Sequence, residues 1–425
     1  MSDLKGDTHG IEPWPVRRLS DLVVLPSGQV SPLVEPYSEM TLVAPDHVES
    51  RTGRLLARES AREQGAISGK YAFATDDVVY SKIRPYLRKA YLAEFDGICS
   101  ADMYPLRPSA ELDSRFLLHT LLDEDFSRFA ESVSMRTGIP KLNRSEFEEY
   151  CLRVPPVDEQ RRIADKIDDV DRAMHVSRAT IDQLMMERIG LVRDLLCYGV
   201  DEAGRLRNPG NNPSALRHVA GRVLLQGWER VALGTLCRVR RGASPRPIDD
   251  PRWFSSNGPG WIRIADVTRS RGQLTVTTQH LSEEGVRRSV RVHPGQVIMS
   301  IAATVGLPII VGTDACIHDG FVVFDRHEET LDTTFLVTLL TYMTPEFVRQ
   351  GQTGTQANIN TDIVGRSIVS VPPILEQVRI AAILVDFDKL LGAEQSIYRK
   401  LGNIKRGILA DLLTGRVRVP AEVAT

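Results

Sequence analysis

Hydrophobic residues recur at alternating steps of four and three in two long stretches of the chain. Each position of the second stretch lies 217 residues after its counterpart in the first, and polar residues interrupt both stretches at the same two steps. Such steps form the seam of a coiled coil. The shared period indicates an internal duplication and two helices that pair with each other. The seam positions are Ile163, Ile167, Val170, Met174, Ser177, Ile181, Leu184, Arg188, Leu191 and Leu195, then Ile380, Leu384, Phe387, Leu391, Glu394, Tyr398, Leu401, Lys405, Ile408 and Leu412.

Each stretch begins with a duplicated segment. Residues 155–164 read PPVDEQRRIA and residues 372–381 read PPILEQVRIA. Proline ends a strand but is tolerated in the first turn of a helix, where Glu159 and Glu376 would lie near the positive end of the helix dipole. A helix over residues 157–197 would be roughly 60 Å long. Two ordinary helices on separate cores are the alternative, which is disfavoured because globular helices are usually much shorter.

The segments that precede the two helices also correspond to each other. Both are expected to be mixed α and β, because each contains a strand, a short Cys-x-x-Asp segment, a second strand, a helix and a polar loop in the same order. The paired ranges are 14–22 and 228–236, 77–83 and 296–301, 99–102 and 316–319, 103–106 and 320–324, 114–132 and 333–350, and 137–143 and 353–360.

These features predict an α+β protein with two mixed α/β domains in tandem, each followed by a long helix, the two helices pairing as an antiparallel coiled coil. Glycine, proline and asparagine mark a linker between the halves. Antiparallel pairing would place the globular domains at opposite ends of the coil, around a pseudo-two-fold axis. The expected boundaries are 1–155 for the first domain, 156–199 for the first helix, 200–227 for the linker, 228–372 for the second domain, and 373–425 for the second helix and tail.

Composition narrows the class of protein. A chain of 425 residues is too long for a single hydrophobic core. Its net charge of −2 gives the whole molecule no attraction to polyanions. The five cysteines form no C-x-x-C pair, which argues against structural zinc and fits a reducing compartment. No apolar run reaches 18 residues, so we expect a cytoplasmic protein without membrane contact.

The sequence contains no G-x-G-x-x-G, H-E-x-x-H or G-x-S-x-G motif. The segment from Gly65 to Tyr71 resembles a phosphate-binding loop but is one residue short and lacks a hydroxyl residue after Lys70. The tetrapeptides N-P-P-F and D-P-P-Y of amino-methyltransferases are also missing. His318 and Asp319 could form half of a metal or acid/base site, but a turn between two strands is the favoured interpretation. The prediction is a chain without catalytic residues, cofactor or metal.

Local charge suggests nucleic-acid binding. Residues 51–89 contain nine basic and four acidic residues, and residues 228–291 contain twelve arginines, six acids and no lysine. Arginine can read guanine or hold phosphate with two bonds, and amide side chains can read adenine. A GC-rich genome would also enrich arginine, and a polar turn would also explain the amides. The candidate DNA-binding residues are Lys82, Arg84, Arg88, Lys141, Asn143, Arg240, Arg241, Arg246, Arg263, Gln356 and Asn358.

The two domains differ in nearly all their loops. Two identical DNA-binding domains around a two-fold axis would recognise a palindrome. Two different domains would recognise two different half-sites, with base pairs between them that neither domain contacts. Readers on one face of the duplex are expected about 34 Å apart. A helix pair roughly 60 Å long can set that spacing.

Over nearly its full length the chain resembles a type I restriction-modification specificity (S) subunit. The resemblance rests on the duplicated P-P-x-x-E-Q-x-R-I-A, the openings at Trp14 and Trp228, the segment 82–85, and the closing segment 411–417. It implies two target-recognition domains, each reading half of a split site in double-stranded DNA. Two methyltransferase (M) subunits would bring S-adenosylmethionine and N6-adenine methylation, and motor-nuclease restriction (R) subunits would use ATP and magnesium.

Other classes stay open beside this one. A two-headed DNA-binding regulator would bind its site without partners, and a scaffold would not touch DNA. An autonomous methyltransferase is contradicted by the missing tetrapeptide.

Overall fold

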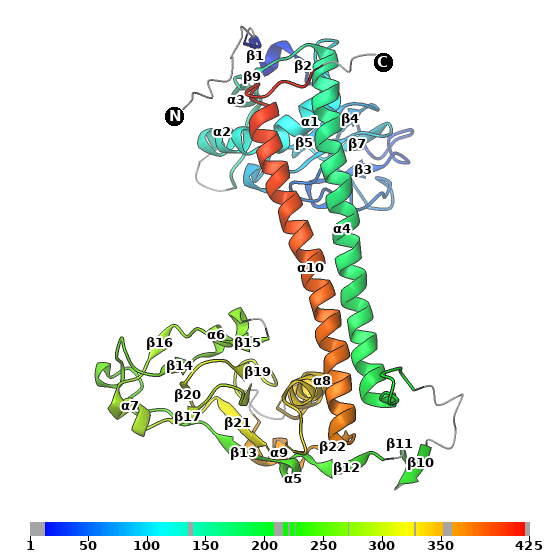
Figure 1. Ribbon diagram of the computed structural model, residues 1–425. Coiled ribbons are helices and arrows are strands. Elements are labelled where there is room, and N and C mark those ends of the chain that lie inside the picture. The colour runs from blue at the N-terminus through cyan, green and yellow to red at the C-terminus, as the bar shows by residue number, and fades with distance from the viewer. Residues whose placement is uncertain are drawn as a thin grey trace, which may run out of the picture. The chain divides into compact units, whose positions relative to one another are not determined.

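The computed structural model describes residues 13–134, 139–207, 216–219, 222–225, 227–270, 272–326, 329–351 and 359–420. The chain divides into two compact units, in which each long helix has one part. Unit 1 contains the residues up to 180 and those from 395 onward, and unit 2 contains residues 181–394. Figure 1 shows both and labels most of their helices and strands.

Unit 1 is built on a four-stranded sheet with the order β2-β8-β5-β6 and a three-stranded sheet with the order β3-β7-β4. The aromatic side chains of Tyr80, Phe116, Phe126 and Phe147 fill its core. Its elements before the long helix are β1 (Val16–Arg18), β2 (Val23–Val24), β3 (Leu42–Val43), β4 (Tyr71–Phe73), β5 (Val78–Ser81), β6 (Ala90–Leu92), β7 (Gly97–Cys99), β8 (Met103–Pro108), α1 (Ser114–Leu122), α2 (Glu124–Ser134), α3 (Arg144–Glu148) and β9 (Cys151–Arg153).

Unit 2 contains a five-stranded sheet, β13-β21-β18-β19-β15, and a four-stranded sheet, β16-β14-β20-β17. Its elements are β10 (Leu216–Val219), β11 (Arg222–Leu225), β12 (Glu229–Ala232), α5 (Leu233–Leu236), β13 (Cys237–Arg241), β14 (Gly260–Ile262), α6 (Ile264–Arg269), β15 (Gln273–Leu274), β16 (Gln279–His280), α7 (Glu283–Arg287), β17 (Val290–Val292), β18 (Val297–Ser300), β19 (Pro308–Val311), β20 (Ala315–Ile317), β21 (Phe321–Arg326), α8 (Thr333–Gly351), α9 (Thr361–Arg366) and β22 (Ile368–Val371).

The two units repeat one scaffold, as the sequence predicted. The antiparallel pair β5–β8 of unit 1 corresponds to β18–β21 of unit 2, and the parallel pair β3–β7 corresponds to β14–β20. In each unit the globular part begins and ends on two paired strands, β1 with β9 and β12 with β22. The mixed α/β class is therefore confirmed. The expected helix over 114–132 is divided at Asp123 into α1 and α2.

The long helices are α4 (Val157–Tyr198) and α10 (Ile374–Leu412), and they pack together in antiparallel directions. In unit 1, Ile163 from the start of α4 shares a core with Leu412 from the end of α10. In unit 2, Leu195 from the end of α4 shares a core with Ile380 from the start of α10. All twenty predicted seam residues are buried or half-buried, as a paired apolar stripe requires.

Two of the polar interruptions in the seams form ion pairs between the helices. In unit 1 the ammonium of Lys405 lies 2.6 Å from an oxygen of Asp171. In unit 2, Arg188 donates to both carboxylate oxygens of Asp388. At the 217-residue offset Asp171 corresponds to Asp388 and Arg188 to Lys405, so the same bond occurs once in each unit. A charge in an apolar seam is tolerated when it has such a partner, and it disfavours other registers.

The duplicated Glu-Gln pair holds each helix start in place. Glu159 is 5% exposed and accepts two hydrogen bonds from Arg418, which follows the end of α10. Glu376 is 3% exposed and accepts two from Arg207, which follows the end of α4. These glutamates therefore bind an arginine distant in sequence, a stronger interaction than the helix-dipole effect that the sequence suggested.

The neighbouring glutamines tie each helix to its own domain. The Gln160 amide accepts a bond from the backbone N–H of Asp113 and donates to the carbonyls of Glu111 and Pro155. Gln377 makes the same three kinds of bond, to Asp332 and to the carbonyls of Thr330 and Pro372. Both glutamines are fully buried, and their bonds satisfy backbone groups just before α1 and α4 in unit 1 and just before α8 and α10 in unit 2.

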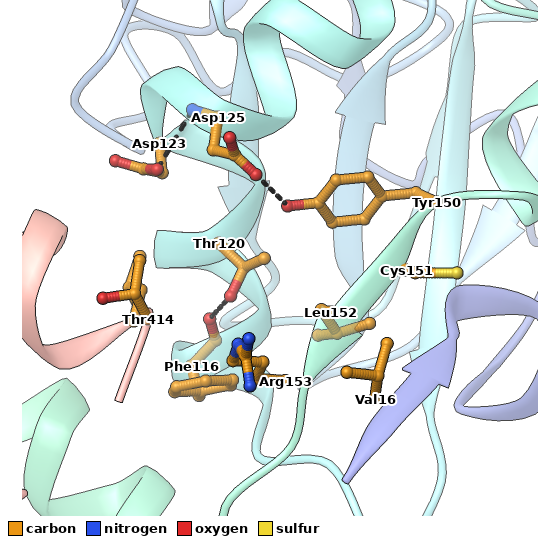
Figure 2. Close-up of a pocket in the computed structure, with 11 residues that line it drawn as sticks. Val16, Phe116, Thr120, Asp123, Asp125, Tyr150, Cys151, Leu152, Arg153 and Thr414 are labelled. Atoms are coloured by element: carbon orange, nitrogen blue, oxygen red, sulfur yellow. Dashed lines mark hydrogen bonds between the residues drawn. The ribbon is translucent and has the colours of Figure 1, made fainter. Parts of the chain in front are cut away.

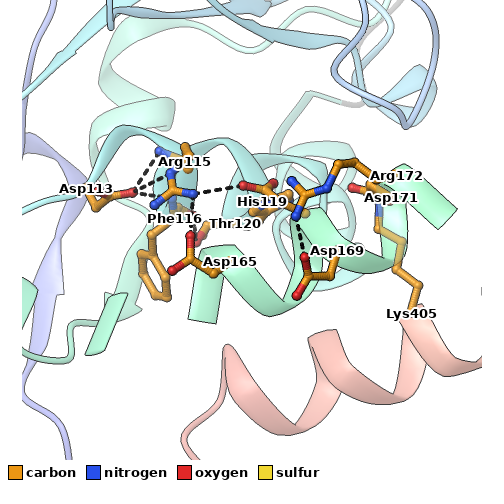
Figure 3. Close-up of polar contacts among 11 residues, drawn as sticks. Asp113, Arg115, Phe116, His119, Thr120, Asp165, Asp169, Asp171, Arg172 and Lys405 are labelled. Atoms are coloured by element: carbon orange, nitrogen blue, oxygen red, sulfur yellow. Dashed lines mark hydrogen bonds and ion pairs between the residues drawn. The ribbon is translucent and has the colours of Figure 1, made fainter. Parts of the chain in front are cut away.

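Unit 1 has an additional polar contact between α1 and α4, shown in Figure 3. His119, 3% exposed, lies 2.7 Å from a carboxylate oxygen of Asp168, and Arg115 bonds to both Asp165 and Asp168. At the 217-residue offset, α10 has Ala382 and Val385 in place of these two aspartates. This additional contact between helix and domain therefore has no equivalent at the same positions of α10.

Asp168→Ala is expected to weaken the α1–α4 contact by roughly 1–3 kcal/mol, because buried His119 loses its partner. Although burial by itself raises the pKa of Asp168, bonds from His119 and Arg115 hold it below the ordinary value. The carboxylate's contribution should therefore be present above roughly pH 4 and disappear as acid protonates it. Hydrogen exchange of residues 114–122 measures the loss. Val385→Ala, at the equivalent and exposed position, is the control, and an equal effect of both variants would contradict the prediction.

Candidate nucleic-acid interface

Unit 1 brings three of the predicted basic residues together on two adjoining loops. Ile83 forms an isolated β-bridge with Lys141, the backbone N–H of Leu142 donates to the carbonyl of Lys82, and that of Arg84 donates to Pro140. The segments 82–84 and 140–142, far apart in the sequence, are thereby held side by side. Arg84 and Lys141 are exposed at this place.

Lys82 lies beneath this surface. It is 7% exposed, and its ammonium is 4.8 Å from the centre of the Tyr104 ring. Burial and the positive charge of Lys141 hold the pKa of Lys82 below its ordinary value, although Asp102 opposes them. The loops therefore concentrate positive charge that a bound anion would stabilise.

The other candidate residues of unit 1 are less available for contact with DNA. Arg84 and Arg88 flank the turn Pro85–Leu87, and both have left-handed backbones with φ of 50° and 48°. The guanidinium of half-buried Arg88 is 3.4 Å from Glu124. Asn143 begins α3, where its backbone N–H donates to Glu146. The side chain of Arg88 would have to exchange its partner in order to contact DNA.

The described parts of the equivalent loops of unit 2 share two backbone features with unit 1 and have different side chains. The backbone N–H of Ile359 donates to Ile301, as that of Leu142 does to Lys82, and Ala303 has a left-handed φ of 60° where unit 1 has Arg84. A hollow of about 280 Å³ opens here, lined by Arg241, Ile301, Ala302, Ile359 and Asn360. A scaffold common to both units thus presents basic side chains from different elements.

Asp319 orients two exposed arginines of unit 2, Arg241 and Arg246. Arg246 donates to its carboxylate at 2.8 Å, Arg241 donates to its backbone carbonyl at 2.9 Å, and Ser244 donates to its other carboxylate oxygen. His318 and Asp319 lie in the turn between β20 and β21, as the favoured interpretation of the sequence expected. In the described residues no group of three or more metal-ligating side chains is gathered.

The other predicted residues of unit 2 have different surroundings. Arg240 lies on β13 and is bound by Asp325 of the neighbouring strand, so it would have to exchange this partner in order to contact DNA. Arg263 donates to the side chain of Gln279 at 3.1 Å. Gln356 and Asn358 lie outside the described residues. Asn360 begins α9, where its side chain accepts a bond from Ile363. The sequence alone did not point to Ser244 or Gln279, since nothing local marks them.

Unit 1 also has an acidic hollow of about 270 Å³, drawn in Figure 2. It lies between the end of α1, β9 and residues 413–414, and the carboxylates of Asp123 and Asp125 line it together with one guanidinium, that of Arg153. Tyr150 donates to Asp125, and burial and this carboxylate raise the pKa of its hydroxyl. Carboxylates repel a polyanion, so this hollow is not part of the candidate interface.

In the described chain, no helix is long and apolar enough to span a membrane.

Comparison with known proteins identifies the scaffold. The Type I restriction modification DNA specificity domain matches residues 44–185 and 226–402. The EcoDI specificity subunit of a type I restriction enzyme from Escherichia coli is 36% identical over 157 residues, which are 37% of this chain and about a third (34%) of that protein. The MjaVIII specificity subunit from Methanocaldococcus jannaschii is 23% identical over 335 residues, which are 76% of this chain and 75% of that protein.

Solved structures share the fold over nearly the whole chain. One, from work on complex assembly and conformational transition of the type I R-M system, has a TM-score of 0.63 and 21% identity and covers 96% of this chain and 99% of its own. The type I restriction-modification S subunit from M. genitalium has a TM-score of 0.56 and 14% identity, with coverages of 96% and 98%. Because the specificity domain matches twice and spans about three quarters of the residues, the chain belongs to the type I restriction-modification specificity subunits.

Proposed function

We propose that this chain selects the DNA sequence for a type I restriction-modification complex, that it reads a bipartite asymmetric site in double-stranded DNA, and that each target-recognition domain reads one half. The observation that carries this proposal is one scaffold built twice with different side chains at equivalent places. Unit 1 has Lys82 and Arg84 where unit 2 has Ile301 and Ala303. Unit 2 instead presents Arg241 and Arg246, which Asp319 orients.

The charges of these loops favour a nucleic acid over a protein partner. Lysine and arginine bind phosphates and release counterions, and arginine also forms two parallel bonds to guanine. The candidates that take part are Lys82, Arg84, Arg88, Lys141, Asn143, Arg241, Arg246 and Arg263, with Gln356 and Asn358 expected from the sequence. Readers with different side chains select different bases, so the complete site would be asymmetric.

The long helices are proposed to dock two M subunits, and through them the R subunits. Leu390, Ile397 and Ile404 lie seven residues apart on α10, which places them on one side of the helix, and each is about half exposed. On α4, Met186 and Ile189 are 70% and 66% exposed. Apolar residues left exposed in this way mark surfaces for a protein partner. S-adenosylmethionine, ATP and magnesium would be bound by the partner subunits, which carry out the chemistry.

The proposal is tested by expressing the chain with its neighbouring methyltransferase gene in a host without DNA methylation and sequencing the methylome of single molecules. N6-methyladenine at one split, asymmetric motif, absent when this chain is omitted, is the expected result. A soluble complex that leaves the genome unmethylated would contradict it. DNA binding by the purified chain alone would then distinguish a two-headed regulator, which binds its site, from a scaffold, which does not.

A further inference from the structure

The parallel strands β14 and β20 end at the same edge of their sheet. Ile262 is paired with Ile317, so the next residues, Arg263 and His318, emerge side by side. The turn that contains His318 also adjoins the candidate interface, because the backbone N–H of Ile301 donates to Gly320 and Arg241 donates to Asp319. His318 therefore lies on the turn that binds Arg241 and Arg246, and Arg263 lies next to His318.

A buried tryptophan supports both side chains. Trp261 is fully buried, and the guanidinium carbon of Arg263 is 4.9 Å from its ring centre. The His318 ring meets the same tryptophan edge-on, with 6.1 Å between ring centres, and Phe321 edge-on at 4.9 Å. Gln279 accepts a hydrogen bond from Arg263 at 3.1 Å. Such contacts hold a guanidinium plane and an imidazole in one orientation before any ligand arrives.

The hydrogen-bond pattern assigns the proton of His318. The backbone N–H of Gly320 donates to Nδ1 at 2.9 Å, so the neutral ring carries its proton on Nε2 and can donate from there. A side chain at position 320 would lie 2.5 Å from the imidazole Cε1, so glycine is required for this ring position. Burial and the positive charge of Arg263 hold the pKa of His318 below its ordinary value, which keeps the ring neutral.

The first target-recognition domain lacks this histidine. The backbone N–H of Met103 donates to the carbonyl of Ser100 as that of Phe321 donates to His318, so unit 1 has Ser100 at the position of His318. The histidine therefore belongs to one domain only. Different side chains at one position of the two domains suit sequence selection better than phosphate binding, since both domains must bind phosphate.

We propose that Arg263 and His318 read one guanine, through its O6 and N7 acceptors in the major groove, in the half-site recognised by residues 228–372. This inference rests on the proposed function. Guanine presents two acceptors on one edge, and a guanidinium fork beside an imidazole N–H supplies matching donors. The pair is thus a specificity-determining element of the second domain.

The test uses the complex of this chain with its M subunits and single-molecule methylome sequencing of Arg263→Ala, Arg263→Lys and His318→Ala. Each variant is expected to methylate sites in which one guanine of one half-site is replaced. In competition binding with duplexes that differ at that base pair, discrimination should fall roughly tenfold or more. Arg263→Lys keeps the charge but loses the fork, so it too should relax the motif. Arg291→Ala, an exposed arginine of the same sheet, is the control and should leave the motif unchanged.

Three outcomes separate the possibilities. An unchanged motif with weaker binding to every duplex would mean that the pair contacts phosphate, and would overturn the inference. An unchanged motif with unchanged binding would overturn it as well. In both cases the wild-type complex still methylates a split motif, so the proposed function stands. A wild-type complex that methylates no split motif would instead contradict the proposed function.

Discussion

Glu376→Ala is expected to destabilise unit 2 by roughly 3–5 kcal/mol, because it removes one partner of a buried ion pair. The Glu376 carboxylate accepts bonds from Arg207 at 2.6 and 3.0 Å, from the backbone N–H of Val200 at 2.9 Å and from the Trp228 indole at 3.3 Å. Without it, a charged group, a backbone N–H and an indole N–H lose their acceptor where water has little access. The end of α4 would then separate from the start of α10.

Urea unfolding followed by tryptophan fluorescence measures this loss, and hydrogen exchange of residues 192–200 locates it. Glu159→Ala should have a similar effect in unit 1, where Arg418 is the partner. The matched control is Asp386→Ala on the same helix, whose exposed pair with Lys389 is expected to contribute less than about 0.5 kcal/mol. If Glu376→Ala costs no more than this control, the buried pair does not hold the helix ends together.

Exchange of residues 228–372 for the corresponding segment of another specificity subunit is expected to replace one half-site completely and leave the other unchanged. The physical reason is that the segment closes on itself. Its first strand, β12, pairs with its last, β22, from Glu229 with Val371 to Ala232 with Ile368. The two junctions therefore lie next to each other. The incoming segment should have tryptophan at position 228, because Trp228 donates to Glu376 outside the exchanged segment.

Methylome sequencing of the hybrid with the original M subunits checks this outcome. The reciprocal exchange of residues 14–155, which likewise lie between paired strands, should replace the other half-site. Changes in both half-sites after a single exchange would refute independent reading. Loss of all methylation in an assembled complex would show that the exchanged segment also takes part in docking.

Much of the fold was predictable because its signals are local. The four-three spacing predicted a helix over residues 157–197, and α4 spans Val157–Tyr198. The strands expected at 77–83 and 296–301 are β5 and β18. Periodicity and chain-breaking residues act within a few positions, so a sequence displays them directly. The sequence did not predict the break between α1 and α2 at Asp123, because the helical spacing of apolar residues in α1 continues into α2.

The candidate interface was less predictable, because the state of a charged side chain depends on residues distant in sequence. Lys82 and Arg240 looked alike as basic residues, yet Lys82 lies over the Tyr104 ring and Arg240 is bound by Asp325. Arg246 was chosen for its loop, and its partner Asp319 lies 73 residues away. No local pattern signals such pairs, since they form only when strands from different parts of the chain become neighbours.

The sequence by itself determined that this protein is a duplication with two mixed domains and two long apolar stripes, since repeats, periods and breakers are properties of neighbouring residues. Only the tertiary structure decided what the charged residues do. It paired Glu159 with Arg418 and Glu376 with Arg207, and it set Arg263 and His318 side by side on Trp261. The physical reason is that an ion pair or a donor cluster is defined by distance and burial, and the folded chain sets both.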